Sequence, residues 1–269
     1  MRNNSKKTPL TLLLIRKLGS FIRLRRVAAD NALRTALVKW PPLGPLDQSL
    51  VPAQRMKFDN LNLLLGGQIT MLDRTIPFYN TILRCVSYRD KNAVLPEGFS
   101  IVSYKNGYEK SWAELEYSVG DFNSLEDAEN YFVETYLQKR ELQSNILFLL
   151  NSDNAVIGSC IAWQDKRGDD FVSSLHWLVV DEKYHGMGLG RALCCATMKI
   201  FEKQANFPVY IHTQPWSWKA IFLYLSLGFK LQKSDSFSHY ENEYYQAMTA
   251  LKRVVTSKQF ELLQEQSES

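Results

Sequence analysis

The sequence lacks several features that would assign it to a class of protein at once. No apolar run among its 269 residues approaches the roughly 20 that a helix needs to cross a bilayer. Its four cysteines show no metal-ligand spacing, and the adjacent pair Cys194 and Cys195 cannot readily form a disulfide with each other. The sequence therefore predicts no integral membrane segment and no metal site, and its thiols fit a reducing cytoplasm.

Acidic side chains are scarce at the start of the chain. Residues 1–70 hold twelve Lys and Arg against three Asp, a net charge of +9. The remainder holds twenty Lys and Arg against twenty-five Asp and Glu, a net charge of −5. The body of the chain is thus acidic and lacks the basic face expected of a nucleic-acid-binding domain. We expect no nucleic-acid partner.

Three interpretations of the basic extension, residues 1–70, stay open. Its apolar and basic residues recur at roughly helical spacing, as in a targeting peptide or a membrane-surface helix. It can equally be a disordered tail. The third hypothesis starts the natural protein at Met71, because the codons of Gly66 and Gly67 can spell a bacterial ribosome-binding sequence. Residues 1–70 would then be a leader outside the natural protein, which would reside in a bacterial cytosol.

From residue 71 onward the sequence predicts strands alternating with helices. Strands are expected at 99–105, 145–150, 155–164, 173–180, 209–213 and 229–232. Helices are expected at 108–120, 123–138, 189–203, 216–228 and 241–255. Ser124, followed by Asp127, is the predicted N-cap of the second helix. Hairpins combined with strand–helix–strand units predict an α/β fold with a mixed sheet.

Three glycines alternate where a predicted strand becomes a helix, in DEKYHGMGLGRAL. Glycine loses much backbone entropy on folding, so such a cluster indicates positive φ or the close approach of a ligand. A helix N-terminus offers unpaired N–H groups and a partial positive charge, which favour an anion. Two common phosphate loops do not fit. Arg191 stands at the third glycine of the dinucleotide fingerprint, and the Gly-Lys-Ser/Thr of a P-loop is missing.

Two motifs resemble those of the GNAT N-acetyltransferase superfamily. VDEKYHGMGLGRAL is similar to the Arg/Gln-x-x-Gly-x-Gly/Ala loop that wraps the CoA pyrophosphate, with Gly188 and Gly190 at the two small positions. His185 stands where Arg or Gln is usual. WKAIFLYLSLGFK is similar to the second hallmark, Ala-x-x-x-Tyr-x-x-x-Gly-Phe, and Ser217 precedes it where Asn is common. The resemblance covers roughly residues 75–265.

The resemblance implies a domain over residues 71–269 with a central, mostly antiparallel sheet that is splayed at the CoA site and flanked by helices. It implies acetyl-CoA as the acyl donor and no metal. The residues that it places at the donor are Leu178, Val179, Val180, His185, Gly186, Met187, Gly188, Leu189, Gly190, Arg191 and Ser217.

The resemblance also assigns catalytic roles. Tyr224 matches the tyrosine that protonates the CoA sulfur, and the amide of Val180 is the expected oxyanion donor. The general base stays open among His176, His212 and Glu116. The cysteines have no partner motif for a covalent acyl-enzyme, so direct transfer is expected. In addition, Trp216 or Trp218 could wall the acceptor pocket.

The sequence therefore predicts an N-acetyltransferase that moves an acetyl group from acetyl-CoA to a primary amine in a ternary complex. The acceptor, a small molecule or a peptide, is not identified. A GNAT-fold module that holds CoA without turnover is the alternative, favoured by His185 and Ser217 and opposed by Tyr224. A homodimer through sheet edges or the last helix also stays open.

Overall fold

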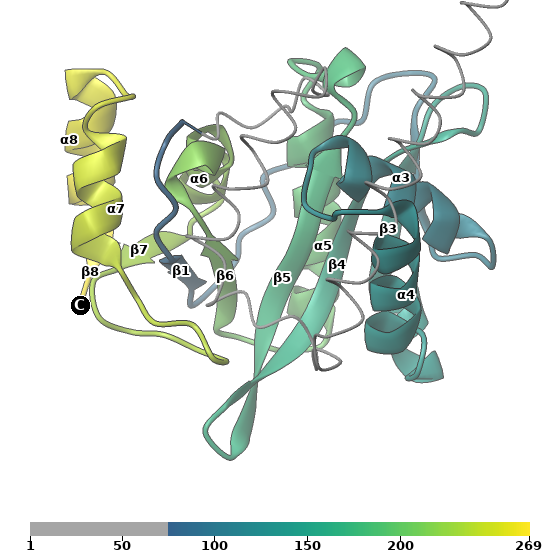
Figure 1. Cartoon of the computed structure of the whole chain (residues 1–269), viewed down its shortest axis with the longest axis horizontal. Coiled ribbons are helices and arrows are strands. Elements are labelled where there is room, and N and C mark those ends of the chain that lie inside the picture. The colour runs from purple at the N-terminus through teal and green to yellow at the C-terminus, as the bar shows by residue number, and fades with distance from the viewer. Residues whose placement is uncertain (1–74) are drawn as a thin grey trace, which may run out of the picture. The chain divides into compact units, whose positions relative to one another are not determined.

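A computed structural model describes residues 75–269, and the expectations for residues 1–70 lie outside the described residues. One mixed sheet has the strand order β2-β3-β4-β5-β6-β1-β7-β8. In Figure 1, α3 and α4 cover one face of its central strands and α5 covers the other. This arrangement confirms the predicted α/β fold.

The elements follow in chain order. The strands are β1 (Thr81–Cys85), β2 (Ser100–Ser103), β3 (Ile146–Leu150), β4 (Val156–Arg167), β5 (Asp170–Val180), β6 (Val209–Thr213), β7 (Lys230–Gln232) and β8 (Ser267–Glu268). The helices are α3 (Tyr108–Ser118), α4 (Leu125–Tyr136), α5 (Leu189–Lys203), α6 (Trp218–Ser226), α7 (Tyr244–Leu251) and α8 (Ser257–Glu265). Three 3-10 turns join them, η2 (Arg140–Asn145), η3 (Glu182–Tyr184) and η4 (Pro215–Ser217).

The local signals that predicted helices and hairpins are confirmed. Ser124 caps α4 by accepting a hydrogen bond from the Asp127 N–H at 3.0 Å. The expected hairpins join β3 to β4 and β4 to β5 as antiparallel pairs. The helix expected at 241–255 is α7, which is shorter than predicted, and the capping box of Thr256 and Gln259 begins a further helix, α8, that was not predicted.

Strand β1 was not predicted from the sequence, although it lies deep in the sheet. It runs antiparallel to both neighbours, and Leu83 pairs with Ile211 of β6 and with Leu231 of β7. Ile82 and Leu83 are both fully buried, so the two faces of the strand are apolar. A short strand buried on both faces shows no alternation, and its five residues carry no periodic signal.

The sheet opens between β5 and β6, as the family resemblance predicts. These parallel strands pair only at Ser173 with Val209 and at Ser174 with Tyr210. Beyond that point β5 follows β4 as far as Val180, whereas β6 follows β1. The opening thus lies between the last residues of two strands that are each held on the other side.

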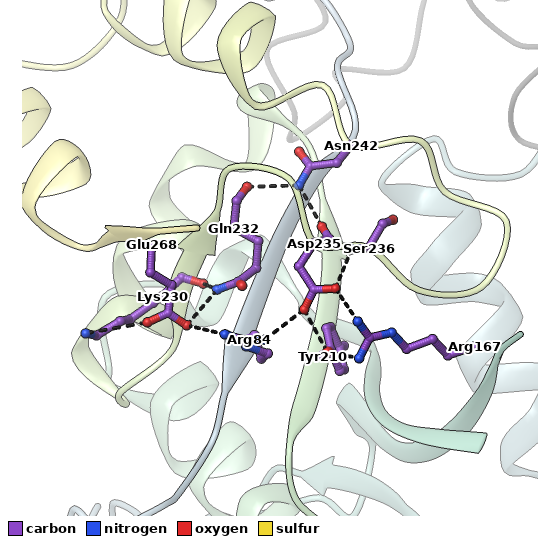
Figure 2. Close-up of polar contacts among 9 residues, drawn as sticks. All are labelled: Arg84, Arg167, Tyr210, Lys230, Gln232, Asp235, Ser236, Asn242 and Glu268. Atoms are coloured by element: carbon purple, nitrogen blue, oxygen red, sulfur yellow. Dashed lines mark hydrogen bonds and ion pairs between the residues drawn. The ribbon is translucent and has the colours of Figure 1, made fainter. Parts of the chain in front are cut away.

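A polar network closes the sheet where the opening starts (Figure 2). Asp235, in the connection from β7 to α7, accepts hydrogen bonds from Arg84 of β1 at 2.9 Å and from the hydroxyl of Tyr210 on β6 at 2.9 Å. Arg167 of β4 bonds both Asp235, at 2.5 Å, and the Tyr210 hydroxyl, at 2.8 Å. Arg84 also pairs with Glu268 of β8 at 2.9 Å. The carboxylate of Asp235 therefore joins strands from both halves of the sheet.

Loss of this carboxylate should loosen the joint. Asp235→Asn should lower the free energy of unfolding by about 1–3 kcal/mol, because Asp235 accepts charge-assisted bonds from two arginines in a largely buried position. The difference should shrink at high salt, which screens the more exposed Arg167. Urea denaturation measures it, with Asp153→Asn at an exposed turn as the matched control. Equal stability of the two variants would contradict this role of Asp235.

Candidate active site

The glycine loop between β5 and α5 is held open by backbone conformation. Gly186 and Gly188 have φ of 80° and 79°, in the left-handed region that glycine adopts without strain. A Cβ at either position would meet nothing within 4 Å, so the space beside the loop is free for a ligand. Gly190 lies inside α5, where an added Cβ would make only ordinary contacts, at 3.9 Å, with Leu223 and Val180.

The start of α5 presents unpaired N–H groups. The first bond of the helix runs from the Ala192 N–H to the Gly188 carbonyl at 3.0 Å. The N–H groups of Leu189, Gly190 and Arg191 therefore precede the hydrogen-bonded ladder. Their positive end, beside the open loop, favours an anion. The Arg191 side chain is engaged with the Ser226 hydroxyl on α6 at 2.7 Å.

His185 ties the loop to the end of β5. Its Nε2 lies 2.9 Å from the Val180 carbonyl, to which it donates, and its backbone N–H bonds the Glu182 carbonyl at 3.0 Å. Both of these donors are used within the chain. The contribution of His185 is thus to fix the loop, and the N–H groups that follow it are the ones left for a ligand.

A β-bulge sorts the last residues of β5 between the two faces of the sheet. Ser159 of β4 pairs with Val179 and Ile161 pairs with His176, so Trp177 and Leu178 share one position. Trp177 has φ of 51°, and its carbonyl accepts the Ser159 hydroxyl at 3.3 Å. After the bulge, Leu178 packs with α5, whereas Val179 packs under α3.

Gly158 lets β4 approach this bulge. A Cβ there would lie 2.7 Å from the Val179 carbonyl oxygen and 3.3 Å from a methyl of Val180. No side chain fits against a backbone oxygen at that distance. The close contact fixes the positions of Val179 and Val180 at the edge of the opening.

Tyr224 lies on the same side as the glycine loop. It is 5% exposed and belongs to the core cluster that contains Val180, Leu189 and Leu193. Burial raises the pKa of the Tyr224 phenol well above its usual value, and Cys194 and Cys160 add to the effect. The phenol is therefore protonated at neutral pH and can donate a proton.

The opposite face carries a hydrogen-bonded chain centred on His176. Its Nε2 lies 2.6 Å from Asp165 Oδ2 and its Nδ1 lies 2.9 Å from the hydroxyl of Tyr136 on α4. Asp165 also accepts the Ser174 hydroxyl at 2.7 Å. Burial alone would raise the pKa of Asp165, but its interactions with His176 and Ser174 outweigh burial and lower it. Asp165 is thus held as a carboxylate.

His212 occupies the matching position across the opening. His212 lies two residues past Tyr210, and His176 lies two residues past Ser174. Tyr210 and Ser174 are paired with each other. Its ring stacks on Tyr240 at 3.7 Å, and its Nε2 lies 2.8 Å from the Asn80 side-chain oxygen. Burial lowers the pKa of His212 to about 3, with smaller effects from His239 and His176. The imidazole is neutral at physiological pH.

Glu116 is buried where α3 crosses the bulge. Trp112, one turn earlier, packs edge-on against Trp177 at 5.4 Å, and Leu115 packs on Val179. Glu116 is 1% exposed, and its Oε1 has no hydrogen-bond partner in the described part of the chain. Burial, and the nearby charge of Asp121, raise the pKa of its carboxyl well above the usual value. Glu116 thus tends to hold a proton.

Comparison with known families agrees with this geometry. The model of the family described as Acetyltransferase (GNAT) family matches residues 108–229. The chain carries a GNAT acetyltransferase domain. The matched segment begins at α3 and includes the bulge, the glycine loop and Tyr224. The match assigns residues 108–229 to a family of acetyltransferases.

Solved structures similar to the GNAT domain show low identity. A GCN5-related N-acetyltransferase from Sphaerobacter thermophilus is 16% identical, with a TM-score of 0.44, over 57% of this chain and 48% of that one. A GNAT-family acetyltransferase from Staphylococcus aureus Mu50 is 18% identical, with a TM-score of 0.38, over 48% and 82%. Glucosamine-6-phosphate N-acetyltransferase from Arabidopsis thaliana is 18% identical, with a TM-score of 0.40, over 54% and 99%.

This chain thus spans about half the length of the first of these structures. No curated protein sequence matches it.

The GNAT domain brings some expected site residues together and separates others. His176 and His212 flank the opening on one face, whereas the glycine loop and Tyr224 lie on the other. Trp216 packs against Phe78 at 5.2 Å, beside Ile76. The Ser217 hydroxyl accepts a hydrogen bond from the Gln214 side chain at 3.0 Å.

Three polar residues on the same face as His176 were not predicted. Asp165 lies just beyond the strand expected at 155–164, Tyr136 lies within the helix expected at 123–138, and Tyr240 lies outside every expected element. None of them belongs to a motif with fixed spacing. Their meeting at His176 and His212 depends on how α4 and the β7–α7 connection pack on the sheet.

Residues 75–269 contain neither a metal-binding cluster nor a membrane-spanning helix. No three side chains of His, Cys, Asp or Glu gather there in a way that could hold a metal ion. Within the same residues no helix is both long and apolar enough to cross a membrane.

The glycines of the loop should respond differently to alanine. Gly188→Ala should destabilise the protein by about 1–2 kcal/mol, because φ at that position is +79°. Gly190→Ala should be neutral or stabilising, because alanine is about 1 kcal/mol better than glycine in a helix. Thermal or urea unfolding of this matched pair measures the difference. Equal losses would show that crowding, not backbone conformation, selects glycine here.

Glu116 should make the stability depend on pH. The folded chain keeps this proton to a higher pH than the unfolded chain, where a glutamate titrates at about pH 4.3. Between the two pKa values the unfolded chain binds fewer protons, so wild-type stability falls as the pH rises. Glu116→Gln removes this dependence, and its stability relative to wild type should rise with pH across that window. Urea denaturation at several pH values tests this, with Glu114→Gln on the exposed side of α3 as control.

A relative stability of Glu116→Gln that falls as the pH rises would contradict the raised pKa of Glu116.

Proposed function

We propose that the chain is an N-acetyltransferase that transfers the acetyl group of acetyl-CoA to a primary amine by direct attack in a ternary complex. One observation carries the proposal. The strand end Leu178–Val180 is free of β6 and leads straight into a left-handed glycine loop at a helix N-terminus. The GNAT domain match supports the acetyl-transfer class.

The donor is proposed to bind along this strand end and loop. The N–H groups from Gly186 through Met187 and Gly188 to Arg191 would receive the pyrophosphate, an anion suited to a helix start. The free edge of Leu178–Val180 would pair with the pantetheine amides. The Val180 amide would stabilise the oxyanion that forms when the amine attacks the thioester carbonyl.

Tyr224 is the proposed general acid. When the tetrahedral intermediate collapses, the C–S bond breaks and the thiolate takes the proton of the Tyr224 hydroxyl. The raised pKa of this phenol keeps the proton available at neutral pH. Ser217, which precedes α6, is the proposed further contact to the donor.

The acceptor is proposed to enter from the opposite face, between α4 and the β7–α7 connection. There the bulge residue Trp177, His176 and His212 bound the opening. A primary amine must be neutral to attack, so a base is required on this side. His176 has an ionised partner in Asp165, whereas the raised pKa of Glu116 favours the protonated carboxyl, which cannot take up the amine proton. A small amine and a peptide remain alternative acceptors.

A second candidate is a module that holds CoA without turnover. The bond from His185 to the Val180 carbonyl favours it, because that side chain is committed to the protein and not to the donor. The protonated Tyr224 favours turnover. In either case the four buried, free thiols suit a reducing cytoplasm.

Binding and turnover are separable by experiment. Acetyl-CoA and free CoA should both raise the unfolding midpoint of the full chain, by about 2.7 kcal/mol in free energy at a hundredfold excess over Kd. Tyr224→Phe should keep this shift and lose about 10²-fold or more in the rate of thiol release with amines. Tyr244→Phe, another buried tyrosine, far from the loop in sequence, is the matched control.

No shift with either ligand would refute the donor site. A shift without thiol release from the wild-type chain would favour the binding module.

A further inference from the structure

His176 cannot contact an acceptor amine through either ring nitrogen. Nε2 is occupied by Asp165 at 2.6 Å and Nδ1 by the Tyr136 hydroxyl at 2.9 Å. Tyr136 is fully buried, so its hydroxyl is also out of reach of a substrate. If His176 takes the amine proton, that proton must arrive through Tyr136.

The hydrogen bonds of His176 have a fixed direction. An ionised carboxylate only accepts, so when the imidazole is neutral its hydrogen lies on Nε2 and points to Asp165. Nδ1 is then an acceptor and receives the Tyr136 O–H. This leaves the Tyr136 oxygen free to accept a hydrogen bond of its own.

Tyr131 supplies the next link toward the acceptor side. It lies on α4, five residues before Tyr136, and is half-buried. The two rings meet edge-on at 6.0 Å, and Tyr131 also contacts Trp177 at 5.6 Å. Tyr131 therefore reaches from the bulge at the opening to the buried Tyr136.

We infer that Tyr131, Tyr136, His176 and Asp165 form a proton relay that serves the acceptor amine. The inference rests on the proposed function. A proton leaves the amine nitrogen for the Tyr131 oxygen while the Tyr131 proton passes to Tyr136 and the Tyr136 proton passes to His176 Nδ1. Both hydroxyls end as they began, and the imidazolium is stabilised by Asp165. The proton returns to solvent after the product leaves.

In this relay Tyr131 is the group that touches the substrate, and Asp165 is a positioning residue. It holds the His176 tautomer and the charge that forms there, as the Ser174 hydroxyl in turn holds Asp165. Other titratable groups on elements packed around the relay are His212, His239 and Tyr240.

Tyr136→Phe tests the relay, because it keeps the ring and removes only the hydroxyl. Thiol release from acetyl-CoA is followed with a panel of tyramine, spermidine, an amino acid amide and a short peptide, across pH. The relay predicts that kcat falls by about 10²-fold or more. It also predicts that the curve of kcat against pH differs in shape from that of the wild-type chain. The shift of the unfolding midpoint by acetyl-CoA should be unchanged, because the donor binds on the other face.

The matched control is Tyr244→Phe, which removes one partly buried hydroxyl bond, to Ser267 at 2.9 Å, on a different helix, α7. If Tyr136 only stabilises the fold, both variants lose stability and keep the kcat of the wild-type chain. A kcat of Tyr136→Phe within about twofold of this control would overturn the relay while leaving the proposed function intact. Absence of turnover in the wild-type chain, with acetyl-CoA bound, would overturn both.

Two further measurements test the relay independently of the Tyr136→Phe variant. Asp165→Asn should lower kcat by a similar factor with little change in the KM of acetyl-CoA, whereas an unchanged kcat would count against the relay. Nitrogen NMR of the imidazoles should show His176 with its hydrogen on Nε2 in the wild-type chain. A hydrogen on Nδ1 would reverse the direction of the Tyr136 bond and overturn the relay without any assay of activity.

Discussion

The candidate site depends on a parallel contact between β5 and β6 that is only two residue pairs long. A longer contact would close the opening, and a shorter one would let the two halves of the sheet separate. Asp235 stabilises the contact by bonding Arg84, Arg167 and Tyr210 from three strands. Each strand that flanks the opening is also paired on its outer side, so the unpaired backbone groups face the opening alone.

The bulge in β5 gives the two faces of the opening different chemistry. It directs Leu178 and Val180 to the side of the glycine loop, and His176 and Trp177 to the side of α4. The side of the glycine loop is a backbone surface, built from N–H groups and a helix start. The side of α4 is a side-chain surface of histidines, tyrosines and an ionised Asp165.

Burial favours the uncharged form of the groups around the opening, which is the protonated form of an acid and the unprotonated form of a histidine. It keeps Tyr224 and Glu116 protonated and His212 neutral, because each would otherwise carry an unpaired charge in a poorly solvated place. Asp165 escapes this trend because His176 and Ser174 stabilise its charge. The site therefore holds a proton donor on one face and a paired carboxylate on the other.

The sequence by itself determined what short-range physics encodes. Positive φ at Gly186 and Gly188, the cap at Ser124 and the two hairpins each depend on a few neighbouring residues, and the two spaced motifs indicated a GNAT domain. Tertiary structure alone decided that β1 lies between β6 and β7, that Asp165 and Tyr136 engage His176, and that Glu116 is buried. These outcomes join residues distant in the chain, such as Leu83 and Leu231. Pairing and burial at such separations depend on the whole packed sheet, which no local pattern of residues specifies.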